Sequence, residues 1–104
     1  MFILRWIVTY KKNKIMLEVK KFYGTWCGPC KMLAPTIEKL KEQHTDVRFI
    51  DIDVDKDFEA ASQYAVRSIP LVVIEKDGKE VQRFSGLQSE MAYNNAINEL
   101  KRVG

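Results

Sequence analysis

At residues 26–31 the chain reads Trp26-Cys27-Gly28-Pro29-Cys30-Lys31, and this stretch holds both cysteines of the 104-residue sequence. Two residues between a pair of cysteines that begin a helix allow the sulfurs to bond to each other. Such a pair can exist as a dithiol or as a disulfide. The spacing therefore predicts a redox couple.

Two other roles for the cysteine pair have to be weighed against redox chemistry. As a structural cross-link the pair is poorly placed, because closing so short a loop contributes about 2 kcal/mol, against about 4.7 kcal/mol for a loop of about a hundred residues. A structural zinc site needs four Cys or His ligands. Beyond Cys27 and Cys30 the sequence offers only His44. Redox chemistry is favoured, and we expect no metal site.

The residues between the cysteines predict different roles for the two thiols. With Pro29 in its first turn, a helix that begins near Gly28 directs its unpaired N–H groups and its positive dipole end toward the Cys27 sulfur. This favours thiolate over thiol. We therefore expect Cys27 to be the more exposed, more acidic thiol and the nucleophile. Cys30, one turn further on, is expected to be buried and to resolve the mixed disulfide.

The segment 26–35 resembles the active-site segment of the thioredoxin family. The resemblance continues through Tyr64-Ala65-Val66-Arg67-Ser68-Ile69-Pro70, through Lys76-Asp77-Gly78-Lys79 and through Gly86, so it covers about residues 16–104. The related glutaredoxins usually carry Pro-Tyr between the cysteines, and the disulfide isomerases Gly-His. The resemblance implies an α/β thioredoxin fold, with a central mixed β-sheet flanked by helices.

Composition sets limits on the size and the partners of the protein. With 46% hydrophobic and 30% charged residues, 104 residues are enough for one globular domain, which we expect to span residues 1–104. The formal net charge of +3 is too small to indicate a nucleic-acid partner.

Residues 1–10 (MFILRWIVTY) leave three alternatives open: a strand, a helix or a disordered extension. Arg5 interrupts the apolar run, and no small-residue cleavage site follows, as a signal peptide would require. The run is also too short to span a bilayer, so no membrane partner is expected. Its aromatic and β-branched residues favour a strand that ends in a polar turn at residues 11–14.

Periodicity and turn signals predict the order of the remaining elements. Strands are expected at 16–23, 47–54, 71–75 and 80–84, and helices at 29–43, at 56–64 and after an N-cap at Ser89. The Asp77-Gly78 pair predicts a tight hairpin between the last two strands. Four alternating aspartates at 51–57 resemble a calcium loop, but Lys56 stands where an EF-hand requires Gly. We interpret them as a strand end that runs into a helix cap near Asp55.

The predicted strand 16–23 is unusually charged for a central strand. Thioredoxins typically have a strand and a helix before this point, and the 15 residues available here are hardly enough for both. We therefore expect a shortened N-terminal strand-helix unit that leaves one face of the sheet open to water. Since side chains alternate across a strand, Glu18 and Lys20 should lie on that face and be largely exposed.

The resemblance assigns substrate-binding roles to residues beyond the cysteines. Pro70 matches the family's cis proline, and the backbone of Ile69 matches the part that pairs with an extended substrate segment. Trp26, Ile69 and Gly86 would form an apolar surface around Cys27, together with Gly28 and Pro29. The usual Thr after the cis proline is Leu71 here, so the substrate preference is left open.

Lys21 departs from the family pattern. Thioredoxins typically carry a buried Asp at this position, which helps to move the proton of the second cysteine, and their partner Lys falls at Asp51 here. The charged pair is therefore expected with its members exchanged, and Asp51 would be the proton acceptor for Cys30. The alternative is that Lys21 extends to solvent without a partner.

Taken together, the resemblance implies a cytoplasmic, monomeric protein-disulfide reductase without a bound cofactor. Its partners would be protein disulfides and, as electron donor, an NADPH-dependent flavoprotein thioredoxin reductase. A non-catalytic scaffold subunit of a larger enzyme is the alternative, since thioredoxins are known to be used in this way.

Overall fold

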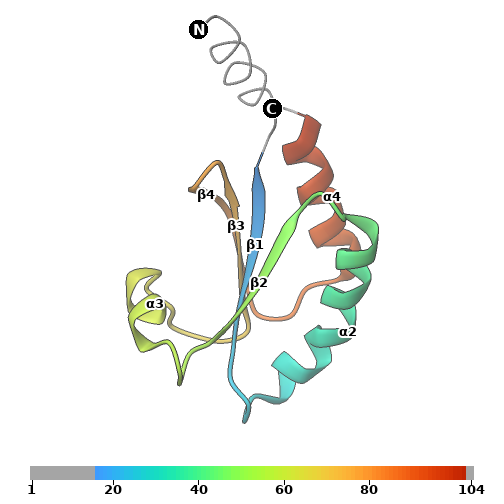
Figure 1. The fold of residues 1–104 in the computed structure, drawn as a ribbon. Coiled ribbons are helices and arrows are strands. Elements are labelled where there is room, and N and C mark those ends of the chain that lie inside the picture. The colour runs from blue at the N-terminus through green and yellow to red at the C-terminus, as the bar shows by residue number, and fades with distance from the viewer. Residues whose placement is uncertain (1–15, 103–104) are drawn as a thin grey trace, which may run out of the picture.

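The computed structural model describes residues 16–102, and they form an α/β fold (Figure 1). The strands are β1 (Leu17–Tyr23), β2 (Arg48–Asp53), β3 (Leu71–Lys76) and β4 (Lys79–Ser85), and the helices are α2 (Gly28–Gln43), α3 (Phe58–Gln63) and α4 (Glu90–Arg102). These are the predicted elements in the predicted order, with ends shifted by one or two residues. The strand expected at residues 1–10 lies outside the described residues.

The four strands form one mixed sheet in the order β2-β1-β3-β4. β1 and β2 run parallel, whereas β1 with β3 and β3 with β4 are antiparallel. The β3–β4 hairpin turns at Asp77 and Gly78, whose φ angles of 52° and 85° match the mirror-image turn that the Asp-Gly pair predicts. Because β1 and β2 are parallel, their carboxyl ends meet at one edge of the sheet, and there the chain leaves β1 for Cys27 (Figure 1).

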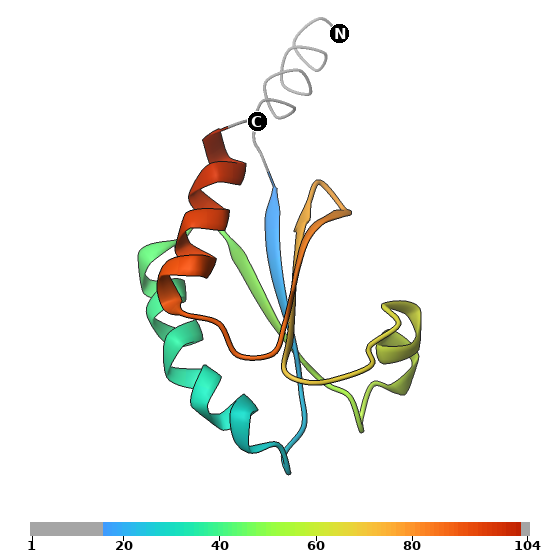
Figure 2. The same ribbon diagram turned by 180° about the vertical axis from the view of Figure 1, so that it is seen from behind.

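The sheet carries a different cover on each face. Among the helices of residues 16–102, α2 and α4 lie on one face and α3 lies on the other (Figures 1 and 2). The α2–α4 face buries the larger core, made of Leu17, Val19, Leu33, Ile37, Leu40, Val47, Val72, Ile74, Tyr93 and Ile97. The α3 face has a smaller buried cluster of Phe22, Leu71 and Val73.

The prediction that Glu18 and Lys20 are largely exposed is wrong. Their side chains keep only 21% and 17% of their surface accessible. The Lys20 ammonium lies 3.0 Å from the Glu75 carboxylate on β3 and donates a hydrogen bond of 2.7 Å to the Tyr64 hydroxyl. Both residues do lie on the α3 face, but neighbouring charged and polar side chains cover them there.

The helix caps bear out one prediction and correct another. The Ser89 hydroxyl accepts from the Ala92 amide, as expected for the N-cap of α4. α3 begins later than predicted, and its N-cap is Asp57, which accepts from the Ala60 amide, rather than Asp55. Within residues 16–102 no helix is both long and apolar enough to cross a membrane.

Candidate active site

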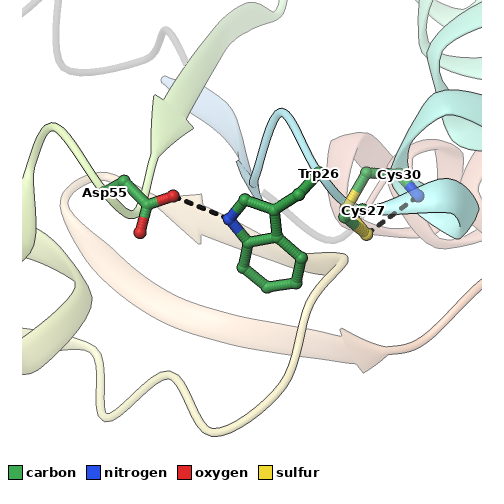
Figure 3. The surroundings of a disulfide bond; sticks show 4 residues. All are labelled: Trp26, Cys27, Cys30 and Asp55. Carbon is green, nitrogen blue, oxygen red and sulfur yellow. Dashed lines mark hydrogen bonds between the residues drawn. A yellow bond between two sulfur atoms is a disulfide. The ribbon is translucent and has the colours of Figure 1, made fainter.

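Cys27 and Cys30 form a disulfide at the start of α2, with Cα atoms 5.3 Å apart (Figure 3). Cys27 is the N-cap residue, and Pro29 lies in the first turn, as predicted. The Cys30 amide donates to the Cys27 sulfur at 3.1 Å. The unpaired amides and the positive dipole end of α2 are therefore directed at the sulfur on which thiolate charge would develop.

The expected difference in exposure between the two cysteines is absent from this disulfide form. Each is 4% exposed. In this form the Cys27 sulfur is bonded to the Cys30 sulfur and accepts from the Cys30 amide in the first turn of the helix. A difference in reactivity remains a prediction for the dithiol.

Trp26 covers the sheet edge beside the disulfide. Its side chain is 66% exposed, and its indole nitrogen donates to the Asp55 carboxylate at 2.7 Å. The ring is directed away from the sulfurs, toward Asp55 (Figure 3). Sequence analysis missed this role of Asp55. Because β1 and β2 are parallel, a carboxylate just after β2 lies at the same end of the sheet as Trp26, which follows β1.

Ile69 and Pro70 are joined by a cis peptide bond, as the resemblance implies. Pro70 is buried, and its carbonyl accepts from the Gly86 amide at 2.9 Å. Gly86 has a φ of 77°, and a Cβ there would meet no other atom within 4 Å. The structure thus brings Gly86 against Pro70, and their role in binding substrate stays a prediction.

Gly24 is a second residue that sequence analysis missed. A Cβ at this position would lie 3.0 Å from both the Ile69 Cδ1 atom and the Trp26 ring. The Gly24 carbonyl also accepts from the Cys27 amide. The missing side chain therefore lets Trp26 and Ile69 approach each other next to the cysteine pair.

Lys21 and Asp51 are register partners on β1 and β2, and their charged groups are 3.8 Å apart. The expected exchanged pair is present as an ion pair, and Lys21 does not run to solvent alone. Its ammonium also lies 5.2 Å from the centre of the Tyr23 ring. Only one member is buried, because the Lys21 side chain is 11% exposed and that of Asp51 43%.

His44, the one further zinc ligand considered, has both ring nitrogens engaged. Nε2 lies 2.6 Å from the Asn94 amide oxygen, and Nδ1 lies 2.8 Å from the Lys101 ammonium. Across residues 16–102 there is no group of three or more His, Cys, Asp or Glu residues that could hold a metal ion.

Comparisons with known proteins agree with the geometry of the site. The family model for thioredoxin matches residues 7–99. Thioredoxin-2 of Saccharomyces cerevisiae is 49% identical over 70 residues, which are 67% of each chain. Thioredoxin of Bacillus subtilis is 39% identical over 79 residues, 75% of this chain and 76% of that one. The Fasciola hepatica thioredoxin structure superposes with a TM-score of 0.76 at 40% identity, covering 92% of this chain and 91% of that one.

Proposed function

This chain belongs to the thioredoxin family and is a thiol-disulfide oxidoreductase, and from that premise we propose that it carries electrons to protein disulfides in the cytoplasm. The observation that carries the proposal is the Cys27–Cys30 disulfide at the amino end of α2, with the Cys30 amide directed at the Cys27 sulfur.

The proposed reaction exchanges one disulfide for another. The Cys27 thiolate of the dithiol form attacks one sulfur of the target disulfide, which forms a mixed disulfide and expels a target thiolate. Cys30 loses its proton and attacks the Cys27 sulfur, which expels the second target thiolate and forms the Cys27–Cys30 disulfide. Two electrons pass to the target, and its two thiolates take up two protons.

The substrate surface that we propose surrounds the cysteines. Trp26, Gly28 and Pro29 are exposed, and Ile69 is half-buried beside the Trp26 ring. Pro70 and Gly86, which are joined by a backbone hydrogen bond, complete the proposed surface. An exposed apolar surface of this kind suits an extended protein segment better than a small charged thiol.

For Lys21 and Asp51 we propose roles in the resolving step. Alternation along β1 places Lys21 on the face that α2 covers, together with Leu17 and Val19. A buried ammonium favours thiolate over thiol on that face. Its partner Asp51, half-exposed and 3.8 Å away, would accept the proton of Cys30 and pass it to solvent. Asp51→Asn should therefore change the pH dependence of turnover, and an unchanged profile would refute this role.

The electron donor that we propose is an NADPH-dependent flavoprotein reductase, with this chain as a monomeric, single-domain carrier. The test is NADPH-coupled reduction of a protein disulfide with such a reductase supplied. Cys27→Ser, Cys30→Ser should abolish NADPH consumption, whereas a scaffold subunit would keep its activity without either cysteine. In the reduced parent, alkylation near neutral pH should reach Cys27 first, and faster reaction at Cys30 would reverse the roles assigned here.

A further inference from the structure

Arg67 lies between two pockets beside the active site. The first, about 370 Å³, is mainly apolar, and Trp26 and Ile69 are part of its lining. Its other lining residues are Val54, Ala61, Val66, Arg67 and Ser68. Trp26 and Ile69 also belong to the proposed substrate surface, so the pocket is continuous with that surface. An apolar side chain of a bound protein segment can fill it.

The second pocket, about 270 Å³, has a mixed polar and apolar lining. Two arginines and two serines contribute to its lining, which consists of Ala65, Arg67, Ser68, Leu71, Arg83 and Ser85. Guanidinium and hydroxyl groups are donors that a carboxylate can accept from. Arg67 and Ser68 belong to both linings, so a segment that fills the first pocket passes the second.

The backbone before Arg67 is fixed by the way α3 ends. Ala65 adopts a left-handed φ of 51°. Its amide donates to the Ser62 carbonyl at 3.0 Å, and the Val66 amide donates to the Ala61 carbonyl at 2.9 Å. This pair of bonds is a Schellman motif. Val66 thereby packs against the small core of the α3 face, and Arg67 is left exposed at a defined position.

The two arginines of the second pocket differ in how far their charge is already neutralised. Arg83 donates to both carboxylate oxygens of Glu80, at 2.7 and 2.9 Å, and to the Tyr64 carbonyl. Among the described residues Arg67 makes no hydrogen bond or ion pair. Of the two arginines that line the second pocket, Arg67 is therefore the one whose charge is not neutralised by a neighbouring carboxylate. The Asp55 carboxylate is bound to the Trp26 indole, so an acidic group is disfavoured on that side of the first pocket and favoured on the Arg67 side.

We propose that Arg67 is a specificity-determining residue, which favours protein disulfides that carry Asp or Glu within a few residues of the attacked cysteine. The apolar pocket holds a neighbouring side chain of the same segment, and the carboxylate lies against the Arg67 guanidinium within reach of the Ser68 and Ser85 hydroxyls. This inference rests on the proposed protein-disulfide reductase activity.

The test uses synthetic disulfide-linked peptides that differ in one residue. Glu, Gln or Lys is placed in turn at each of the three positions on either side of the cysteine, and kcat/KM for reduction is measured at low salt. For at least one position we expect the order Glu, Gln, Lys, with Glu over Gln by roughly 1.5-fold to fivefold, as one exposed ion pair allows. The preference should shrink as salt is added.

Arg67→Gln should bring the ratio of kcat/KM between the Glu and Gln peptides close to one, and Arg67→Lys should retain part of the preference. The matched control is Arg48→Gln, which removes the same charge near the opposite end of β1, where Arg48 pairs with Glu18. Equal rates for Glu and Gln peptides in the parent, or an equal preference in Arg67→Gln, would overturn the inference. Reduction of no peptide by the parent would instead refute the proposed function, and the inference with it.

Discussion

The two faces of the sheet are covered by different kinds of side chain. On the α2–α4 face, two helices of 16 and 13 residues cover apolar side chains, and the result is a core of ten buried residues. On the other face, α3 has six residues and covers only part of the sheet. On that face the apolar cluster extends along β1 only as far as Phe22. Beyond it, the face is covered by the bonded side chains of Lys20, Glu75 and Tyr64.

The difference shows how a half-covered sheet can carry charges on a central strand. Tyr64 accepts from Lys20 and donates to Glu75, and Lys20 pairs with Glu75 directly. Among the described residues, no buried side-chain nitrogen or oxygen lacks a hydrogen-bond partner. Because each polar group is satisfied, this face tolerates charges where, within residues 16–102, no helix covers them.

Truncation of the helix-covered face should have the largest effect. Ile97 is fully buried between α4 and the sheet. Ile97→Ala should lower the free energy of unfolding by about 2 to 5 kcal/mol, through lost burial and the cavity left behind. The measurement is urea unfolding. The matched variant is Ile52→Ala, a partly buried isoleucine on the α3 face, which should cost clearly less. Equal losses would mean that the two faces are equally well packed.

Breaking the network on the α3 face should cost less than the core truncation. Lys20→Met removes one partner and leaves the Glu75 carboxylate, whose side chain is 8% exposed, with Tyr64 alone. We expect a loss of about 1 to 3 kcal/mol in urea unfolding.

The double variant Lys20→Met, Glu75→Leu tests whether the charges themselves stabilise the α3 face or whether apolar side chains at the same positions do so equally well. Since both charges are replaced by apolar groups, stability should return to within about 1 kcal/mol of the parent. A double variant less stable than Lys20→Met would show that the charges contribute more than the apolar surface that could replace them.

Alkaline pH should weaken the network selectively. Burial alone would lower the pKa of Lys20, but its hydrogen bonds to Tyr64 and Glu75 hold that pKa above the ordinary value of 10.5. Burial and the bond to Glu75 raise the pKa of Tyr64 above 10.0. Both groups hold their protons more tightly in the folded state, so their contribution is complete below about pH 10 and is lost as the pH rises through the raised values.

The unfolding free energy should therefore fall as the pH rises above about 10, and Tyr64→Phe should flatten that decline. Burial also raises the pKa of Tyr93 on the other face. Tyr93→Phe should then flatten the decline independently, and the two effects should add. An unchanged slope in both variants would exclude the tyrosines as its cause.

The parts of the site that sequence analysis predicted correctly depend on neighbours in the chain. The helix start at Gly28 with Pro29 in its first turn follows from local propensity, and so does the turn at Asp77 and Gly78. Residues 16–23 were also recognised as a strand, despite their charges.

What was missed depends on contacts between distant segments. Glu75 is paired opposite Glu18 by the β1–β3 register, and Tyr64 reaches Lys20 from the end of α3. The period of β1 gives the correct face for Lys20, but it cannot show that 44 residues later a hydroxyl will cover the ammonium. The same is true of Asp55 and Trp26, which are separated by 29 residues.

The smallest expected effect is a gain in the free energy of unfolding, and it tests the backbone conformation at the end of α3. Ala65, the residue that terminates α3, has a φ of 51°. An L-residue in this region costs roughly 1 to 2 kcal/mol, whereas Gly does not, although Gly adds entropy to the unfolded chain. Ala65→Gly should therefore stabilise the protein by a few tenths to about 1 kcal/mol. Ala92→Gly, inside α4 on the well-covered face, should instead destabilise it by roughly 0.5 to 1 kcal/mol. Opposite signs in urea unfolding would place backbone strain at the end of α3, whereas a loss in both variants would mean that the Schellman turn is already relaxed with Ala.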